Sequence, residues 1–393
     1  MNIILHMGDA YPNESPAAKR MQAFQEVLTN RGHSVTVMAP RFKNTVTKAE
    51  NTVYCPTIEL KKKTTLLRML NQLSFAFSSI LLCKKAGKAD VVLTTSPPVL
   101  ISMAGWFIAK VKKAKLVYDV RDIWPDVALE MGSFTETSLF CKVFSFIRDF
   151  MLKHADLVTA VSPGKVTKLQ SYPHKSKIAY ITNGLDEHFL ENEFHQEVAE
   201  KYGLCTGFNC VYIGNIGWAQ GLNQLMDLAQ RVKENNLNVR FILFGSGVEE
   251  ESLQQYAKVH CLDNVVFAGR LPNQEMYTIL KSAQLSFVSL VNNKLKDSVP
   301  TKIFEALGVG CPVLLAAVGD SADILNQCKL GIATPPNDLE SLWNAFLKIY
   351  SAPQEYMQYR EHTISVIKNE YSRQKASLQL ETALLDILNN TKQ

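Results

Sequence analysis

Short apolar runs alternate with amphipathic stretches along most of the chain, and this alternation predicts strands separated by helices. In the first half the runs have the length of buried strands, and they lie at 3–6, 35–39, 89–94, 116–120, 157–161 and 178–181. Strands joined by crossover helices build a parallel, doubly wound α/β sheet. The alternation continues from 209 to about 350 with about six strand–helix units. The pattern therefore predicts two Rossmann-like domains.

Length and composition agree with two domains. The chain has 393 residues, of which 47% are hydrophobic and 20% charged, so it has enough apolar material for two cores and too little charge for a disordered protein. The eight cysteines include no C-x-x-C pair, which argues against a zinc site and a disulfide scaffold and fits a reducing compartment. The first residues predict a strand instead of a signal peptide, so we expect a cytoplasmic protein.

Charge is divided unevenly between the two halves. Residues 1–190 carry 25 Lys and Arg against 15 Asp and Glu, whereas the remainder carries 17 against 22. A basic half beside an acidic half indicates that the first half meets an anionic partner, either nucleic acid or a membrane. The alternative is a basic surface that only keeps the protein soluble.

Two apolar stretches favour the membrane. The first, 66–82, is at the short limit for a bilayer span and is interrupted by Arg68 and other polar residues. The second is 99–111. Lysines flank both stretches, at positions 61, 62, 63, 84, 85, 88, 110, 112, 113 and 115. Such flanks are typical of a helix that lies on an anionic leaflet, although a buried helix with solvated ends would look similar. We predict peripheral membrane association and no nucleic-acid partner.

The stretch 297–313 carries the most specific candidate chemistry. Pro300 suits the first turn of a helix, and a buried strand is expected after that helix. Lys302 and the carboxylates of Asp297 and Glu305 would then share one rim of an α/β sheet, where a helix N-terminus favours anions and a carboxylate can accept sugar hydroxyls. The alternative is an ordinary strand–helix junction that happens to carry acidic residues.

Further candidate ligands lie where other predicted strands end. The glycine-rich loop 214–221 precedes a helix, so its backbone N–H groups could meet a diphosphate. The stretch 119–126 places an Arg, a Trp and several acids beyond the carboxyl end of a strand, where open α/β sheets bind ligands. A G-x-G-x-x-G fingerprint is absent from the first loop, which argues against a dinucleotide oxidoreductase. No Asp-x-Asp follows a strand in a suitable place, so we expect no metal.

Two of these stretches resemble motifs of a known family. Asp297 and Glu305, with seven residues between them, resemble the paired-acid motif of the retaining glycosyltransferases of family 4, which have the GT-B fold. Arg121 to Pro125 resembles the Arg-Asp-x-Trp-Pro signature of a bacterial subgroup that makes surface polysaccharides, including N-acetyl-L-fucosamine transferases. The resemblance extends from Gly8 to about residue 342. The chain departs from the family in its shorter first acid and in carrying Arg121 where many relatives have His.

The resemblance implies an activity and a set of roles. The enzyme would move a sugar, such as the N-acetylated deoxysugar L-FucNAc, from a UDP-sugar to a lipid-linked saccharide during capsule, O-antigen or exopolysaccharide synthesis, without a metal. Asp297 would meet the transferred sugar and Glu305 the donor ribose, with Arg121 and Asp122 also in the catalytic site. The implied donor-binding residues are Gly8, Arg20, Gly214, Asn215, Gln220, Gly221, Gly245, Arg270, Leu271 and Lys302, together with Glu305.

The resembled fold also implies boundaries. Residues 1–188 would form the acceptor domain and residues 189–365 the nucleotide-sugar domain facing it, with a helical linker at 189–204; residues 366–393 would return to the first domain as a helix. Two other functions stay open. One is a UDP-sugar 2-epimerase of the same fold, which would turn over the donor alone. The other is a non-catalytic scaffold that binds nucleotide-sugars.

Overall fold

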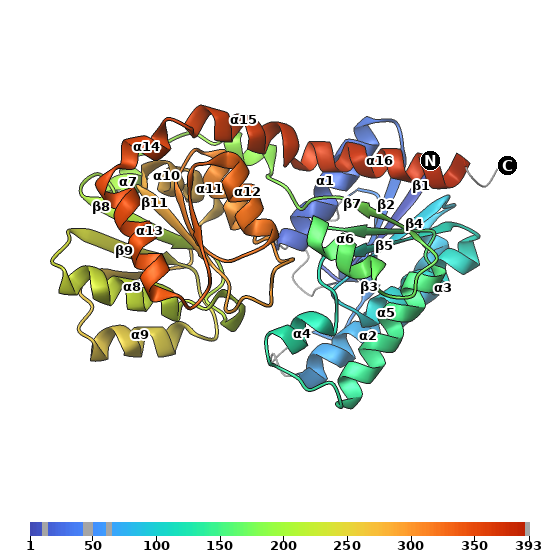
Figure 1. The fold of residues 1–393 in the computed structure, drawn as a ribbon. Helices are drawn as coiled ribbons and strands as arrows, with labels where there is room; N and C mark the ends of the chain where they lie inside the picture. The colour runs from blue at the N-terminus through green and yellow to red at the C-terminus, as the bar shows by residue number, and fades with distance from the viewer. Residues whose placement is uncertain (10–14, 42–49, 60–64, 390–393) are drawn as a thin grey trace. The chain divides into compact units, whose positions relative to one another are not determined.

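The computed structural model describes the chain with the exception of residues 10–14, 42–49, 60–64 and 390–393. Lysines 61, 62 and 63, expected to flank an apolar helix, therefore lie outside the described residues. Contacts divide the chain into two compact units (Figure 1). The first unit comprises residues 1–183 and 373–393, and the second comprises residues 184–372. The sequence placed the two boundaries at 188/189 and 365/366.

The first unit is built on a sheet of seven parallel strands in the order β3-β2-β1-β4-β5-β6-β7. The strands are β1 Asn2–His6, β2 Ser34–Arg41, β3 Thr52–Pro56, β4 Val91–Ser96, β5 Lys115–Val120, β6 Leu157–Ala160 and β7 Lys177–Tyr180. The edge strand β3 was not predicted, because only Cys55 of its five residues is buried and the strand lacks an apolar pattern.

Helices cover both faces of this sheet because its strands are apolar on both sides. Ile3 and Leu5 of β1 point to a core shared with α1 (Pro16–Asn30) and α16 (Arg373–Asn389). Ile4, between them, points to the opposite core, shared with α2 (Thr65–Leu82), α3 (Leu100–Lys112) and α5 (Leu139–His154). Strand residues alternate between faces, so a run of consecutive apolar residues fills both cores.

The terminal helix α16 belongs to the first unit and packs on α1 (Figure 1). Leu380 and Leu384 are fully buried in the core that also contains Phe24 of α1. Beside them, Glu381 accepts hydrogen bonds from Arg31 at 2.9 Å and His33 at 2.7 Å. Burial alone would raise the pKa of Glu381, but these two partners hold it below its usual value. Apolar packing and a paired carboxylate thus attach the helix.

The second unit has a parallel sheet of six strands in the order β10-β9-β8-β11-β12-β13. Its strands are β8 Phe208–Ile213, β9 Val239–Phe244, β10 Val265–Gly269, β11 Leu285–Ser289, β12 Val313–Ala316 and β13 Gly331–Thr334. Its helices are α7 Gln196–Lys201, α8 Asn223–Glu234, α9 Glu250–Val259, α10 Asn273–Ser282, α11 Lys302–Gly308, α12 Asp320–Cys328, α13 Leu339–Ser351, α14 Pro353–Met357 and α15 Arg360–Glu370. Two Rossmann-like units confirm the predicted α/β class.

The predicted helical linker over 189–204 is wrong as a single helix. The structure has a short 3-10 helix, Glu187–Glu191, and then α7 after an interruption. The Asn192 side chain donates to the carbonyl of His188 at 3.3 Å and to that of Phe189 at 2.9 Å. A short polar side chain that binds the preceding carbonyls replaces the bonds that would continue a helix.

Packing of α16 predicts a large stability loss on Leu380→Ala. Truncating a fully buried leucine removes apolar contacts and leaves a cavity, which costs about 2–5 kcal/mol of unfolding free energy. Leu378 on the same helix is 37% exposed, so Leu378→Ala should cost less than about 1 kcal/mol. Urea unfolding of both variants measures the difference. Equal losses would contradict the packing described for α16.

Candidate nucleotide-sugar site

The loops after β8 and β9 touch each other through glycines. A Cβ at Gly245 would lie 1.8 Å from the carbonyl oxygen of Gly214, and one at Gly247 would lie 2.0 Å from that of Ile216. The Gly214 backbone, at φ 147°, also lies in a conformation that side chains disfavour. Because only glycine permits this approach, the sequence holds both loops together at the carboxyl edge of the second sheet, as expected for a ligand site.

Not every amide of the loop after β8 is available to a ligand. The N–H groups of Gly214 and Ile216 donate to carbonyls of the β9 strand and its loop, at 2.9 and 3.1 Å. Those of Gln220 and Gly221 donate within the loop itself. Among the described residues, the backbone N–H groups of residues 215 and 217–219 donate to no carbonyl oxygen. Gly214 and Gly221, which were predicted to bind the donor, therefore shape the loop, because their own N–H groups are already bonded within the protein.

Lys302, the first residue of α11, extends into this loop cluster. Its Nζ donates to the Tyr212 hydroxyl at 2.7 Å and lies 4.0 Å from the centre of the Tyr212 ring. A Cβ at Gly214 would lie 2.9 Å from Nζ, so the glycine leaves room for the amine. Burial lowers the pKa of Lys302 to about 7, although the charge of Glu305 opposes the shift. The amine is thus enclosed and favours an anionic partner.

The two predicted acids lie on either side of Lys302 along the chain. Glu305 is half-buried on α11, one turn after Lys302. Asp297 is half-buried in the turn before the helix, and backbone contacts fix that turn. The carbonyl of Ser298 accepts from the Ser321 hydroxyl at 2.6 Å, and the carbonyl of Lys296 accepts from the next helix at 2.9 Å. The carboxylates are therefore carried by ordered backbone.

Gln220 lies at the far end of the same loop, where it meets the end of β11. The Ser289 hydroxyl donates to the Gln220 carbonyl at 2.6 Å, and Val291 N donates to the neighbouring Ala219 at 2.9 Å. The side-chain oxygen of Gln220 is buried without a recorded partner among the described residues. Gly221 (φ 57°) turns the chain into α8, at a position where a Cβ would lie 2.7 Å from the backbone of Val291.

Arg270 and Leu271 follow β10, next to the β9 loop. The Arg270 Nε donates to the Ser246 hydroxyl at 2.8 Å, while the side chain remains exposed. The structure thus brings Arg270 to the loops that carry Gly214 and Gly245, and Lys302 lies against the same loops. Leu271 is half-buried one residue further along the chain.

Arg20 has a structural role in the first unit. Its guanidinium is 1% exposed and pairs with the fully buried Asp119 at 3.0 Å. It also donates to the carbonyls of Ile181, at 2.9 Å, and Thr182. Asp119 accepts in addition from the Thr159 hydroxyl at 2.7 Å. The resemblance implied that Arg20 binds the donor, but the structure places its guanidinium inside the unit, where it ties α1 to β5, β6 and the segment after β7.

Arg121 and Asp122 lie just beyond the end of β5, as predicted. The Arg121 Nε donates to the Thr95 hydroxyl at 3.1 Å, and another nitrogen donates to the carbonyl of Pro97. Burial lowers the pKa of Arg121, and the neighbouring Asp122 carboxylate acts against this. Arg121 therefore fixes the loop after β4. Gly8, in the loop after β1, lies close to that loop, since a Cβ there would lie 2.8 Å from Pro98.

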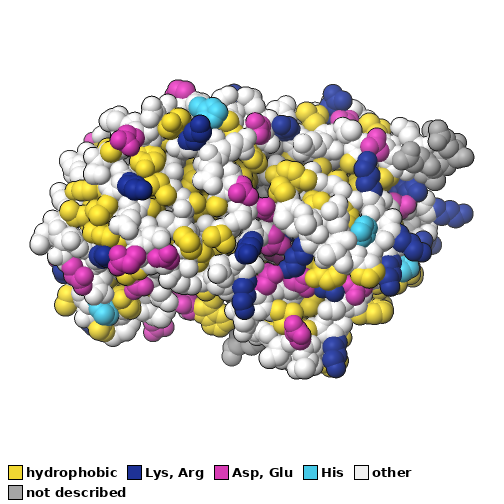
Figure 2. All heavy atoms as spheres, in the orientation of Figure 1, with side chains coloured by type: hydrophobic (Ala, Val, Ile, Leu, Met, Phe, Trp, Pro, Cys, Tyr) yellow, Lys and Arg dark blue, Asp and Glu magenta, His cyan; other side chains and the backbone are white. Residues whose placement is uncertain are grey.

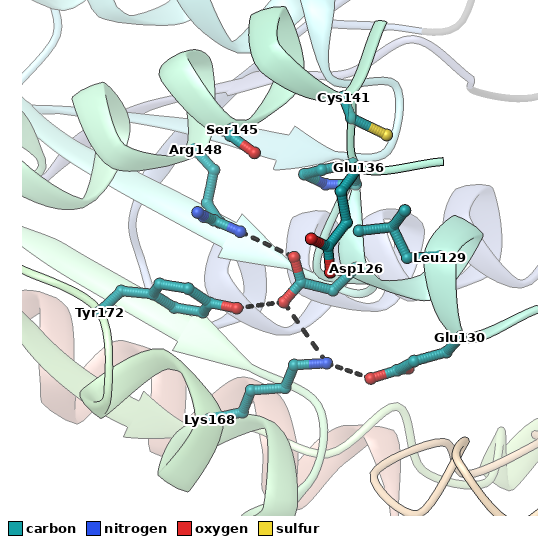
Figure 3. Close-up of a pocket in the computed structure, with 10 residues that line it drawn as sticks. Asp126, Leu129, Glu130, Glu136, Cys141, Ser145, Arg148, Lys168 and Tyr172 are labelled. Atoms are coloured by element: carbon teal, nitrogen blue, oxygen red, sulfur yellow. Dashed lines mark hydrogen bonds and ion pairs between the residues drawn. The ribbon is translucent and has the colours of Figure 1, made fainter. Parts of the chain in front are cut away.

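A polar cavity of about 430 Å³ lies beside this edge of the first unit (Figure 3). Its centre is Asp126, the first residue of α4 (Asp126–Glu130), which pairs with Arg148 at 2.7 Å and Lys168 at 3.4 Å. The Tyr172 hydroxyl donates to the same carboxylate, and burial and this carboxylate raise the pKa of Tyr172. The network joins α4 to α5 and α6 (Pro163–Gln170) and so anchors the loop that carries Arg121.

Sequence reasoning missed Tyr212 and Asp119, the two residues on which these sites depend. Tyr212 was read only as part of an apolar strand. Asp119 was one of several acids in a polar stretch. The signal for each was a polar group inside an apolar strand, because such a group needs a hydrogen-bond partner in the core. Within the described residues, no group of three or more His, Cys, Asp or Glu side chains is placed to hold a metal ion.

A doubly wound α/β unit whose glycine-lined loops and lysine meet at the carboxyl edge of the sheet has the features of a site for a phosphorylated ligand. Two family models match the chain: the Glycosyl transferase 4-like domain matches residues 17–184, and Glycosyl transferases group 1 matches residues 201–366. The matches cover most of both units. The chain belongs to the family 4 glycosyltransferases with the GT-B fold, so it is a transferase.

Individual relatives are distant. O-antigen chain mannosyltransferase C of Escherichia coli is 23% identical over 56% of this chain and 58% of its own length, so the match spans little more than half of that protein. The putative colanic acid biosynthesis glycosyl transferase WcaI of Escherichia coli K12 is 23% identical over 94% and 97% of the two chains. The crystal structure of Anabaena HepE with UDP and glucose superimposes with a TM-score of 0.76 at 15% identity, covering 98% of this chain and 100% of that one, and supports the fold.

The buried Arg20–Asp119 pair predicts that Asp119→Ala destabilises the first unit strongly. Removing the carboxylate leaves a buried guanidinium without its ionic partner, which costs about 3–5 kcal/mol of unfolding free energy. Asp386→Ala is the control, because its pair with Lys177 is exposed on both sides and should contribute less than about 1 kcal/mol. Denaturant unfolding measures both losses. A small effect of Asp119→Ala would show that the pair is not needed to hold the unit together.

Proposed function

We propose that the enzyme transfers a sugar from a nucleotide-sugar to a lipid-linked saccharide during synthesis of a surface polysaccharide. The observation that carries this proposal is the enclosed amine of Lys302 against the glycine-lined loops, with Glu305 on the same helix. An amine in such a place suits a diphosphate, and a carboxylate beside it suits a ribose. The UDP bound by HepE and the polysaccharide roles named for the two Escherichia coli relatives support the proposal.

The donor would lie along the carboxyl edge of the second sheet. Lys302 and the amides of residues 215 and 217–219 would face the diphosphate, and Glu305 would accept hydrogen bonds from the ribose hydroxyls. The exposed stretch at Arg270 and Leu271 would meet the base. Asp297 would face the transferred sugar. The side-chain oxygen of Gln220, which has no hydrogen-bond partner among the described residues, would accept a hydrogen bond from the nucleotide-sugar.

The reaction needs positioning and stabilisation of the leaving group more than a protein nucleophile. The bond between the anomeric carbon and the diphosphate oxygen breaks, and the diphosphate keeps the electron pair. The acceptor hydroxyl bonds to the same face of the anomeric carbon, which retains configuration, and its proton passes to a phosphate oxygen. Lys302 stabilises the charge that develops on the diphosphate, so the reaction would need no metal. The first unit, through Arg121 and Asp122, would position the acceptor.

Our proposal for the sugar rests only on the resemblance of the Arg121–Pro125 stretch. That stretch resembles the N-acetyl-L-fucosamine transferases, so the donor we propose is a UDP-activated N-acetylated deoxysugar. The chain's Arg121 is consistent with this subgroup, and its guanidinium fixes the loop after β4 instead of serving as an acid or base.

A lipid-linked acceptor fits the surface of the first unit. Helix α3 packs against both α2 and α5, and all three carry apolar side chains that remain exposed. Those side chains are Leu70, Leu73, Phe77 and Leu81 on α2, Phe107 and Val111 on α3, and Leu139, Val143 and Phe146 on α5. Such a set of exposed apolar residues on neighbouring helices is typical of an interaction surface.

Lysines accompany these apolar side chains. Exposed lysines stand at 84, 85, 88, 110 and 113, and α2 and α3 contain no acidic residue. Figure 2 shows Lys and Arg side chains, in dark blue, gathered over the first unit at the right of the view. Within the described residues, no helix is long and apolar enough to cross a bilayer. The exposed apolar side chains and the lysines beside them lead us to propose that the protein lies on the cytoplasmic face of an anionic membrane, where it meets its acceptor.

Membrane binding can be tested with vesicles. Phe77 and Leu81 are 66% and 64% exposed, so changing both to Ser should weaken binding to vesicles containing anionic lipid by at least about tenfold, through lost apolar burial. The matched control changes Val248 and Val259 of the second unit, which are 75% and 65% exposed, to Ser. Co-sedimentation measures both. Equal binding by the two variants would argue against this membrane surface, as would equal binding to neutral and anionic vesicles.

Transfer itself is tested with a panel of UDP-, GDP- and dTDP-sugars. One donor should raise the melting temperature and be consumed when a lipid-linked acceptor is present. Glu305→Gln should lower kcat/KM with that donor by about tenfold to a hundredfold, because it weakens a hydrogen bond to a charged group. Glu251→Gln should have no effect on kcat/KM, because Glu251 is an exposed residue of α9. Near-wild-type transfer by Glu305→Gln would exclude Glu305 as a donor ligand.

The same panel separates the alternatives. Turnover of the donor without any acceptor would indicate a 2-epimerase. Binding of the donor without turnover, even with acceptors present, would indicate a scaffold. Either result would overturn the proposed transfer.

A further inference from the structure

Tyr212 is a polar residue at the centre of an apolar core. Tyr212 is fully buried in β8, among side chains such as Phe241 and Leu243 of β9. A buried tyrosine needs partners for its hydroxyl, and here both partners belong to the candidate donor site. The hydroxyl lies 2.6 Å from the carbonyl oxygen of Asn215 and 2.7 Å from Nζ of Lys302.

The direction of both hydrogen bonds follows from the chemistry of the groups. A carbonyl oxygen only accepts, so the single hydroxyl proton of Tyr212 must be donated to Asn215. The hydroxyl lone pairs then face Lys302, which donates one of its N–H bonds. Burial also raises the pKa of Tyr212, so the hydroxyl keeps its proton. One oxygen atom therefore connects the glycine-rich loop to the lysine.

The ring of Tyr212 acts on the same amine. Nζ lies 4.0 Å from the ring centre, within the range in which an aromatic face attracts a cation. The Glu305 carboxylate, on the same helix as Lys302, also acts on this amine through its charge. Burial opposes the charged form, whereas the ring, the hydroxyl and Glu305 favour it. A bound anion would add to the favourable side.

Resting on the donor site proposed above, we infer that Tyr212 is a positioning residue for donor binding: its hydroxyl orients the Lys302 amine toward the diphosphate and turns the Asn215 carbonyl away from it. A phosphate near an outward-facing carbonyl would be repelled. With the carbonyl held inward, the loop presents fewer oxygen atoms to the anion. Tyr212 itself need not touch the ligand.

The test is Tyr212→Phe, which keeps the ring and the core packing. Calorimetric titration with UDP and with GDP is done from pH 6 to pH 9. In the wild type, affinity should fall as the pH rises above about 7, because the pKa of Lys302 lies near 7 and only the ammonium attracts the diphosphate. The variant should bind about tenfold more weakly at pH 7.5, since one hydrogen bond to a charged group is lost.

A purely structural role for Tyr212 would not change the pH profile. Without its hydroxyl acceptor the ammonium is less stable, so the decline in affinity should begin at a lower pH in the variant than in the wild type. The lysine ¹³Cε chemical shifts of the unliganded protein should report the same displacement for Lys302. Tyr256→Phe is the matched control, because that hydroxyl also has two partners, Asp227 at 2.9 Å and Gln230 at 3.2 Å, both on α8 of the same unit. It should leave both profiles unchanged.

The outcomes separate this inference from the proposed donor site. If the wild type binds neither UDP nor GDP, the donor site fails and the inference fails with it. If the wild type binds and Tyr212→Phe matches it in affinity and pH profile, only the inference is overturned. The same holds if Tyr212→Phe and Tyr256→Phe weaken binding equally, since the effect would then come from loss of stability.

Discussion

The candidate donor site of the second unit depends on the partly buried amine of Lys302. Partial burial of the Lys302 side chain disfavours the charged form of its amine, and the face and hydroxyl of Tyr212 and the charge of Glu305 act in the opposite direction. A diphosphate would add a further negative charge beside this amine and so favour its charged form. The proposed donor site is thus organised around a cation that an anionic ligand would stabilise.

Glycine makes this arrangement possible. The loops after β8 and β9 approach closely enough to surround the amine only because Gly214, Gly245 and Gly247 have no side chain. The first unit uses a different solution at the equivalent edge of its sheet. There the buried Arg20–Asp119 pair joins helix and strands, and Arg121 fixes the loop after β4. One edge carries a cation that we propose for ligand binding, and the other carries a cation already paired inside the protein.

Much of this was visible in the sequence because it depends on local patterns. Apolar runs and their spacing gave the parallel sheets, and the glycines and the acids at 297 and 305 marked the loops of the second unit. Contacts between distant positions were not visible. Tyr212 and Lys302 lie 90 positions apart, and Arg20 and Asp119 lie 99 apart. A single sequence shows neither that two such residues meet nor that an arginine on an amphipathic helix points inward. Strand β3 was missed for a local reason, since it has almost no apolar pattern.

A crystal structure of the protein soaked with UDP would show whether the loops of the second unit and Lys302 bind the diphosphate of a nucleotide-sugar. We expect diphosphate density within hydrogen-bond distance of the Lys302 amine and of amides among residues 215 and 217–219, with the ribose at Glu305. Well-defined UDP density elsewhere on the protein, with these groups unchanged, would overturn the proposed donor site.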